Sequence, residues 1–252
     1  MNARPVKIGG RTIAVADDQP TFWDKVAAGA WEPGTLEVID RFVDDETVFL
    51  DLGAWVGPTA LYAAGRAKRV VAVEADPAAL DQLQRNLGAN PDLAARIEVI
   101  GRAVHADPGV ITLGARRKPG DSMSSTLLAA ASERWHAATV TPDELVSRLG
   151  GAERLFVKLD IEGGEYALLP AAGPLIARAE AILVSFHPKI LAQAVPDRRD
   201  AARRLRDALR PLAGFAARRL TERGAGWRSH APMLVRFGLL GRLPADEWLF
   251  TR

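Results

Sequence analysis

The sequence predicts an α/β domain built on a mainly parallel sheet with helices on both faces. Short apolar runs recur along the chain without polar–apolar alternation, which is typical of strands buried on both faces. Helix-length segments separate these runs, and this alternation is the pattern of parallel sheets covered by helices. The chain has 252 residues, of which 48% are hydrophobic, so it can bury the core of one such domain.

The N-terminal elements come before this alternating pattern. Two strands are predicted at residues 6–8 and 11–15, and two helices at residues 21–28 and 36–42. Gly9 and Gly10 lie between the two strands and suit a tight hairpin turn, because glycine adopts positive φ angles easily. We therefore expect a hairpin and helical extension over residues 1–45, followed by the α/β domain over residues 46–252 as one folding unit.

The elements of the α/β domain follow in order. Five strands are predicted at residues 47–50, 69–73, 97–100, 155–159 and 181–186, and a last strand at residues 247–251. Helices are predicted at residues 58–66, 77–87, 142–149 and 197–210. Residues 110–113 are expected at a sheet edge or in a small hairpin. Residues 114–138 contain Gly, Pro, Ser and Arg without clear periodicity, so we expect a covering loop there.

The composition excludes several classes of function. The chain has no cysteine, which rules out disulfides, thiolate nucleophiles and cysteine-bound metals. Its net charge is +2 with both signs well mixed, so the sequence indicates neither a nucleic-acid partner nor a membrane surface. No apolar run suits a signal peptide or a membrane span. We expect a soluble cytoplasmic protein with a small-molecule substrate, and a homodimer is compatible with this sequence.

A glycine turn at the end of the first sheet strand is the first candidate site. In open α/β sheets, ligands bind outside the carboxyl ends of the strands. Gly53, next to Ala54, allows a tight turn and close approach of a ligand to the backbone, and Gly57 brings the helix start near the same ligand. Asp51 places a negative charge where a ligand ammonium is expected. An acid followed by two glycines suits an amino-acid group better than the pyrophosphate of a G-x-G-x-x-G site. The alternative is a tight turn without a ligand.

The ends of the second and third strands add to this candidate site. Glu74 ends the second strand near the expected spacing of about 20 residues from the glycine turn, where a carboxylate can accept hydrogen bonds from ribose hydroxyls. A surface or helix-capping acid is the alternative, but Asp76 before Pro77 already suits the helix cap. Small residues at Ala75, Ala103 and Val104 are expected to form a flat slot for adenine.

Candidate catalytic residues follow the fourth and fifth strands. Lys158, Asp160 and Glu162 alternate at the end of the fourth strand, and His187 follows the fifth. Asp160 is a candidate for orienting an acceptor, binding the ligand's ammonium or removing a proton, and the alternative is a structural ion pair with Lys158. Neutral imidazole suits proton removal near neutral pH, although a lone histidine is more often structural.

Two further sets of candidate residues lie at the same edge of the predicted sheet. Ser124 and Ser125, with Glu162 and His187, are candidates for binding a polar acceptor, although the serines also suit a solvated loop. Asp160, Glu162 and His187 offer oxygen and nitrogen ligands, but their spacing matches no dedicated metal motif. We therefore expect no metal.

The sequence resembles the FkbM family of class I S-adenosylmethionine-dependent methyltransferases. The residues that carry the resemblance are Trp31-Glu32-Pro33, Asp51–Gly57, Val73–Pro77, Asn86-Leu87, Ala103-Val104, Ser124-Ser125, Val140–Leu145 and Lys158–Glu165. The resemblance implies a Rossmann-like sheet of seven strands with the last strand antiparallel. It also implies S-adenosylmethionine as methyl donor, S-adenosylhomocysteine as product, and a hydroxyl acceptor on a sugar or natural product. Glu32 is expected to face the cofactor, and Trp55 departs from the small polar residue usual in this family.

These observations together favour an O-methyltransferase acting on a sugar or secondary metabolite. Methyl transfer is an in-line displacement in which the protein mainly aligns donor and acceptor. The alternatives are an N-methyltransferase, an NAD-type oxidoreductase, and a cofactor-binding subunit of the same fold without catalysis. The oxidoreductase lacks support because no G-x-G-x-x-G follows the first sheet strand.

Overall fold

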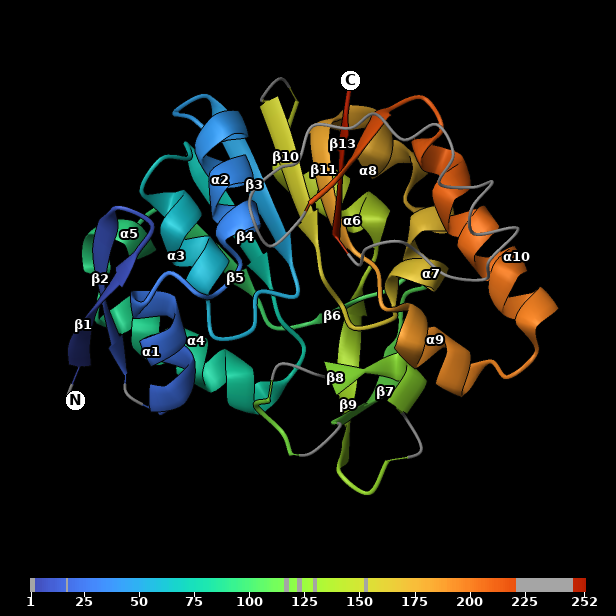
Figure 1. The fold of residues 1–252 in the computed structure, drawn as a ribbon, viewed down its shortest axis with the longest axis horizontal. Coiled ribbons are helices and arrows are strands. Elements are labelled where there is room, and N and C mark those ends of the chain that lie inside the picture. Colours follow the sequence, from blue (N-terminus) through green and yellow to red (C-terminus); the bar gives the residue numbers. More distant parts are fainter. Residues whose placement is uncertain are drawn as a thin grey trace.

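A seven-stranded sheet forms the centre of the molecule (Figure 1). The computed structural model describes residues 3–16, 18–115, 118–121, 124–128, 131–151, 154–220 and 247–252. The strand order is β12-β13-β11-β10-β3-β4-β5. The strands are β3 (Thr47–Leu52), β4 (Arg69–Val73), β5 (Ile97–Ile100), β10 (Arg154–Leu159), β11 (Ala179–Ser185), β12 (Ala216–Arg219) and β13 (Glu247–Thr251). β13 is antiparallel to both of its neighbours, and β5, β4, β3, β10 and β11 are parallel. The predicted fold class, a Rossmann-like sheet with its last strand antiparallel, is confirmed.

Helices cover both faces of this sheet. They are α3 (Pro58–Ala64), α4 (Pro77–Gly88), α5 (Pro91–Ala94), α6 (Pro142–Leu149), α7 (Glu165–Leu168), α8 (Gly173–Arg178), α9 (Pro188–Ala194) and α10 (Arg198–Leu209). Leu50 and Leu52 of β3 pack in one apolar cluster with α6, α8 and α10, whereas Phe49 packs in a second cluster with α3 and α4. This double burial explains why the strand sequences do not alternate. None of the helices in the described part of the chain is long and apolar enough to span a bilayer.

The N-terminal extension packs against the second of these faces. It consists of β1 (Ala3–Ile8), β2 (Arg11–Ala16), α1 (Pro20–Ala27) and α2 (Pro33–Phe42). β1 and β2 form the predicted hairpin, with Ile8 opposite Arg11 across the glycine turn. Val6, Ile8 and Trp23 lie in the same buried cluster as Phe49 of the central sheet. The extension therefore shares its apolar core with the α/β domain.

A small second sheet replaces much of the predicted covering loop. Its strand order is β6 (Ala103–Val104), β9 (Arg134–Val140), β7 (Val110–Ala115) and β8 (Ser124–Ser125), and it lies below the central sheet in Figure 1. The prediction of loop over residues 114–138 was therefore wrong for β9, which pairs with β7 in antiparallel register. Its inward residues are Trp135, Ala137 and Thr139, and this mixture gives only a weak alternating pattern. Residues 116–117, 122–123 and 129–130 lie outside the described part.

A buried amide connects the hairpin to the glycine turn, and it gives a test of the packed extension. Asn86 on α4 accepts a hydrogen bond from the Ala16 backbone N at 2.8 Å and donates one to the Val56 carbonyl at 2.8 Å. We expect Asn86→Ala to lower the free energy of unfolding by about 2 kcal/mol or more, because both backbone groups lose their partner.

Urea unfolding of the purified variant measures this loss. Gln84→Ala is the matched control, because Gln84 is an exposed residue on the same helix. Equal stability of the Asn86 and Gln84 variants would show that the amide does not hold the extension in place.

Candidate active site

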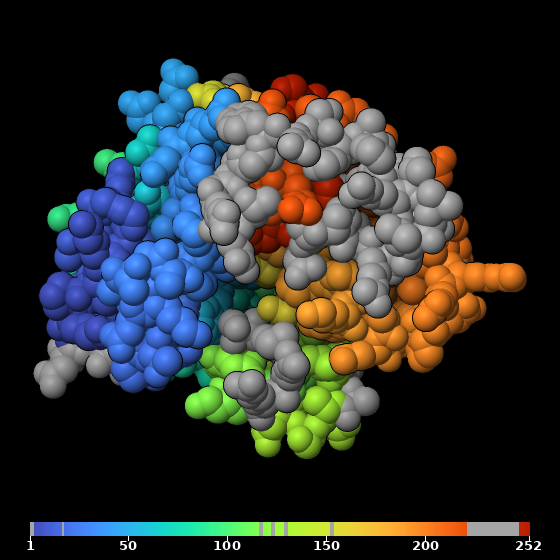
Figure 2. All heavy atoms as spheres, in the orientation of Figure 1, coloured from blue at the N-terminus to red at the C-terminus, as the bar shows by residue number. Residues whose placement is uncertain are grey.

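Two adjoining cavities open at the carboxyl ends of the parallel strands. The larger has a volume of about 640 Å³ and the smaller about 80 Å³. Their shared walls are Gly53, Trp55, Asp121, Asp160 and Glu162. In Figure 2 the surface is hollowed where the blue N-terminal elements, the green small sheet and the orange α9 meet. The cavities thus lie at the edge of the sheet where the sequence places its candidate residues.

The glycine turn is shaped by the neighbouring strand end. Gly53 has a φ of +87°, and a Cβ added there would lie 1.9 Å from the backbone oxygen of Asp160. The Asp160 backbone N donates to the Leu52 carbonyl at 2.9 Å, which holds the two strand ends together. Gly53 therefore has no room for a side chain, which agrees with the predicted tight turn, while close approach of a ligand to its backbone stays a prediction. Gly57, at φ +88°, instead packs its α-carbon against Leu83 of α4.

Glu74 lies at the smaller cavity, as predicted. One of its carboxylate oxygens accepts hydrogen bonds from the backbone N of Ala75 and Asp76, and the other accepts one from Trp55 at 2.7 Å. Burial raises the pKa of Glu74 to about 7, although these hydrogen bonds act in the opposite direction. Ala75, Ala103 and Val104 line the same cavity. The predicted ribose acid and the predicted adenine slot are therefore neighbours.

Trp55 lines both cavities. Its backbone has a φ of 49°, an uncommon conformation for a side chain of this size. The indole Nε1 donates to the Gly120 carbonyl at 3.0 Å, and the ring packs edge-on against Phe22 with centroids 4.4 Å apart. Trp55 thus joins α1 and residues 118–121 across the site and narrows the passage between the cavities.

Asp51 lines neither cavity, and its role beside a ligand ammonium stays a prediction. Its side chain is fully buried, and its Oδ2 accepts a hydrogen bond from the Thr59 hydroxyl at 2.5 Å. Its Oδ1 lies 3.7 Å from Lys158 Nζ, because Asp51 and Lys158 are opposite each other in the β3–β10 register. Burial raises the pKa of Asp51 against the influence of Lys158. Asp51 therefore pairs with Lys158 behind the cavity wall.

Lys158 lies between two carboxylates, those of Asp51 and Asp160. Its Nζ lies 3.2 Å from Asp160 Oδ2, so the ion pair considered from the sequence does form. Burial alone would lower the pKa of Lys158, but the nearby charges of Asp160, Asp51 and Glu32 more than offset this and raise it. Lys158 therefore holds its proton more tightly than an ordinary lysine. The predicted catalytic role of Lys158 stays a prediction.

Glu32 faces the larger cavity with an unsatisfied carboxylate. It precedes α2 with a φ of 40°, and its Oε2 is shielded from solvent without a hydrogen-bond partner. Burial raises the pKa of Glu32 to about 8, while Lys158 acts in the opposite direction. A buried polar atom without a partner at a cavity wall is expected where a ligand supplies the partner.

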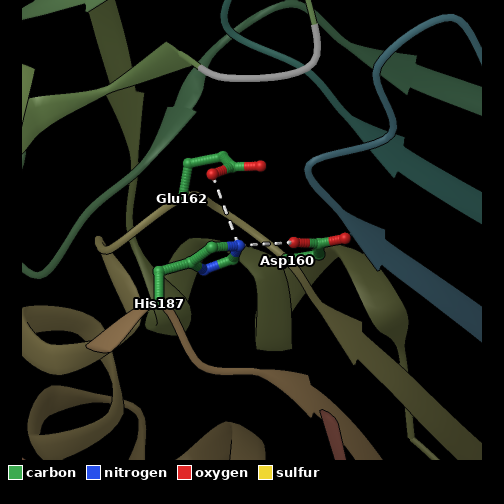
Figure 3. A group of neighbouring side chains, drawn as sticks. All are labelled: Asp160, Glu162 and His187. Atoms are coloured by element: carbon green, nitrogen blue, oxygen red, sulfur yellow. Dashed lines mark ion pairs between the residues drawn. The ribbon is translucent and has the colours of Figure 1, made fainter. Parts of the chain in front are cut away.

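His187, at the end of β11, lies against three carboxylates, and Figure 3 shows two of them, those of Asp160 and Glu162. Its Nε2 lies 3.3 Å from Glu162 Oε2 and 3.6 Å from Asp160 Oδ1, and its Nδ1 lies 3.3 Å from Glu165 Oε1. Burial lowers the pKa of His187, but the Glu165 hydrogen bond and the three negative charges raise it to about 9. The structure therefore brings together Asp160, Glu162 and His187, which the sequence placed on two separate strand ends.

Glu165 is a buried acid at this site that the sequence does not single out as a candidate. It is fully buried, and its carboxylate accepts hydrogen bonds from the backbone N of Gly163 and of His187, both at 2.8 Å. The signal was present, because Glu165 ends the Lys158–Glu165 stretch, but an acid at a helix start is ordinarily explained by capping.

The two serines differ from their predicted role as acceptor-binding residues. Ser125 is fully buried and its hydroxyl accepts a hydrogen bond from the Leu127 backbone N at 3.1 Å, so it does not reach the cavities. Ser124 lines the smaller cavity, but its hydroxyl donates to Asp76 Oδ2 at 2.9 Å. Asp76 also accepts a hydrogen bond from the Gly120 backbone N, so these residues hold the segment above the site.

Comparison with protein families places the chain among methyltransferases. The profile of the methyltransferase FkbM domain matches residues 51–219, which is more than half of the chain. The chain therefore belongs to the FkbM methyltransferase family, and the resemblance given above is confirmed. No curated protein matches the chain significantly.

Two solved structures with a similar fold are distant in sequence. A methyltransferase FkbM from Methylobacillus flagellatus is 18% identical with a TM-score of 0.48, and the match covers 94% of this chain and 56% of that one. A Streptococcus mutans protein assigned as a methyltransferase, in complex with SAH, is 11% identical with a TM-score of 0.46 and coverages of 86% and 94%. This chain thus spans little more than half the length of the Methylobacillus protein.

The glycine turn gives a test of the close contact between β3 and β10. We expect Gly53→Ala to lower the free energy of unfolding by more than the roughly 1–3 kcal/mol of an unfavourable positive φ, because the added Cβ also meets backbone. Gly88→Ala on α4 is the control, since nothing lies within 4 Å of its added Cβ. Urea unfolding measures both variants, and a Gly53 variant as stable as the Gly88 variant would contradict the geometry.

The raised pKa of Glu32 gives a pH-dependent test. A buried carboxyl that keeps its proton up to about pH 8, against an ordinary value of 4.5, stabilises the fold at low pH and loses that contribution as pH rises through 8. We expect Glu32→Gln to gain stability relative to the unchanged protein as pH rises from about 5 to about 8, with no further gain above. Urea unfolding of both proteins across this range, without ligand, provides the measurement. A difference that does not change with pH would show that Glu32 titrates normally.

Proposed function

We propose that the protein transfers a methyl group from S-adenosylmethionine to a hydroxyl of a small acceptor, a sugar or a secondary metabolite. One observation carries this proposal: a narrow cavity with a carboxylate and small apolar walls opens into a larger polar cavity through the shared walls Gly53, Asp160 and Glu162. Such a pair of cavities suits a nucleoside-bearing donor beside an acceptor.

The residues of the narrow cavity suit the adenosine part of the donor. One carboxylate oxygen of Glu74 accepts a hydrogen bond from the Trp55 backbone N. The same oxygen can accept a second hydrogen bond, from a ribose hydroxyl. Ala75, Ala103 and Val104 provide small side chains beside it, which suit a flat adenine ring. Gly53 lines both cavities, so its backbone is available to the donor.

The acidic groups of the larger cavity suit the amino-acid end of the donor. Glu32 Oε2 is buried without a partner, and a ligand ammonium would satisfy it. Asp160, which lies on both cavity walls, is the second carboxylate available to that ammonium. Lys158 lies beside both acids and fixes Asp160 through its ion pair.

Methyl transfer to a hydroxyl requires alignment and removal of one proton. The bound S-adenosylmethionine supplies an activated methyl group together with its leaving group. Asp160 and Glu162 present carboxylate oxygens at the shared walls, where they orient the acceptor hydroxyl and take its proton. His187, held by Glu165, keeps these two carboxylates in place from the end of β11.

Isothermal titration with S-adenosylhomocysteine and with NADH tests the donor. We expect S-adenosylhomocysteine to bind and NADH not to bind, since the glycine turn lacks the pyrophosphate fingerprint. Binding of NADH alone would instead support an oxidoreductase.

Incubation with labelled S-adenosylmethionine and a panel of sugars, polyketides and amines tests the acceptor. We expect label on hydroxylated compounds, and Glu162→Gln to lower kcat by about 100-fold or more with donor affinity nearly unchanged. Glu98→Gln, on β5 and engaged with Arg148, is the control. Label on amines would indicate an N-methyltransferase, and donor binding without any transfer would indicate a non-catalytic subunit.

A further inference from the structure

Three side chains at the shared cavity wall present their ligand atoms to one point. Asp160 and Glu162 follow β10, and His187 follows β11. One ligand atom from each lies within 4.8 Å of the other two. Figure 3 shows Nε2 of His187 directed toward both carboxylates, with neither carboxylate turned away.

The orientation of the imidazole is set from its other side. Nδ1 of His187 faces the carboxylate of Glu165, which is fully buried, so Nδ1 carries a proton and donates it. A neutral imidazole then has its lone pair on Nε2, pointing at two negatively charged oxygens. This arrangement is unfavourable unless a positive centre lies between the three atoms. That centre is either a proton on Nε2 or a cation.

The arrangement of the ligand atoms suits a cation. The ion pairs of this cluster bring the carboxylates of Asp51, Asp160, Glu162 and Glu165 to the cationic groups of Lys158 and His187. Lys158 lies against Oδ2 of Asp160, which leaves Oδ1 facing His187. Glu162 Oε2 is shielded from solvent, and its contact with the imidazole does not have the geometry of a hydrogen bond. Two carboxylate oxygens and the imidazole Nε2 therefore converge on one point.

We propose that Asp160, Glu162 and His187 bind a divalent cation of the Mg²⁺ or Mn²⁺ class. Two carboxylates and one imidazole form a hard donor set without sulfur, which suits these ions. The Glu165–His187 contact is the carboxylate–histidine arrangement that orients metal-binding histidines. Because Asp160 and Glu162 line both cavities, the remaining coordination positions face the space assigned to the acceptor.

The role of this cation rests on the proposed function, but its binding does not. In a methyltransferase, the cation would hold the acceptor oxygen beside the shared wall and neutralise the carboxylates around it. Binding of the cation requires only the three ligand atoms and Glu165, which orients His187. Metal binding is therefore measured separately from methyl transfer.

Mn²⁺ binding to the full chain, freed of metal with EDTA and then dialysed, tests the proposal. Electron paramagnetic resonance and isothermal titration are expected to show one Mn²⁺ per chain. We expect Glu162→Gln and His187→Ala to weaken binding beyond detection, and Glu165→Gln to weaken it by about 10- to 100-fold through loss of histidine orientation. Asp121→Asn is the matched control, because Asp121 lines both cavities without belonging to the three ligands, and its Mn²⁺ binding should be unchanged.

Two outcomes would overturn the metal site. Absence of Mn²⁺ binding at millimolar concentration would show that a proton on His187 occupies the position. Equal binding by the unchanged protein and the Glu162→Gln variant, with circular dichroism confirming that both are folded, would show that Mn²⁺ binds elsewhere. S-adenosylhomocysteine binding, titrated in parallel, reports on the proposed function alone: the donor site can fail while Mn²⁺ binds, and the reverse also holds.

Discussion

The parallel pairing of β3 with β10 is the constraint on which the site depends. This register places Lys158 opposite Asp51 and brings the end of β10 against Gly53. A buried lysine is tolerable only with carboxylate partners, and removing one member of such a group typically costs about 3–5 kcal/mol. Lys158 therefore connects Asp51 inside the sheet with Asp160 at the cavity wall. The position of Asp160 is also fixed by its backbone, which donates a hydrogen bond to Leu52 of β3.

Burial of acids at one edge of the sheet follows from this arrangement. Lys158 is shared between Asp51 and Asp160, and it also influences Glu32. One cation does not satisfy three carboxylates, and the pKa values of Glu32 and Asp51 are raised by their burial. A site with unsatisfied buried acids is costly in the free protein and favours positively charged ligands. The same imbalance supports both the donor ammonium and the proposed divalent cation.

The fold was largely predictable because its signal is local. Apolar runs such as residues 47–50 and 69–73 identify strands buried on both faces, and a proline or a capping acid such as Asp76 identifies where helices begin. β12 was missed because Ala216–Arg219 contains no large apolar residue, and its strand conformation comes from pairing with β13. β9 was missed because small inward residues and Trp135 do not produce a clear alternation.

The site was predictable only to the level of strand ends. Glu74, Asp160, Glu162 and His187 were placed correctly, because carboxyl ends of parallel strands meet at one edge. The direction of each side chain depends on cross-strand register and on hydrogen bonds from distant segments. The Asp51 side chain points into the interior toward Lys158. The Ser125 hydroxyl accepts a hydrogen bond from the Leu127 backbone N. The sequence predicts neither of these contacts.

Trp55 shows how one residue links the donor site to the elements above it. Its positive φ is unfavourable for a bulky side chain, and the Glu74 carboxylate stabilises that conformation by accepting its backbone N–H. The indole then reaches the Gly120 carbonyl, and Asp76, two residues beyond Glu74, accepts the Gly120 N–H. The acid assigned to ribose therefore also holds the turn that positions residues 118–121. The Glu74 carboxylate that is expected to bind ribose also accepts the Trp55 backbone N–H. A ligand that hydrogen-bonds to Glu74 therefore changes the hydrogen bond that stabilises the Trp55 backbone, and with it the wall that Trp55 forms for both cavities.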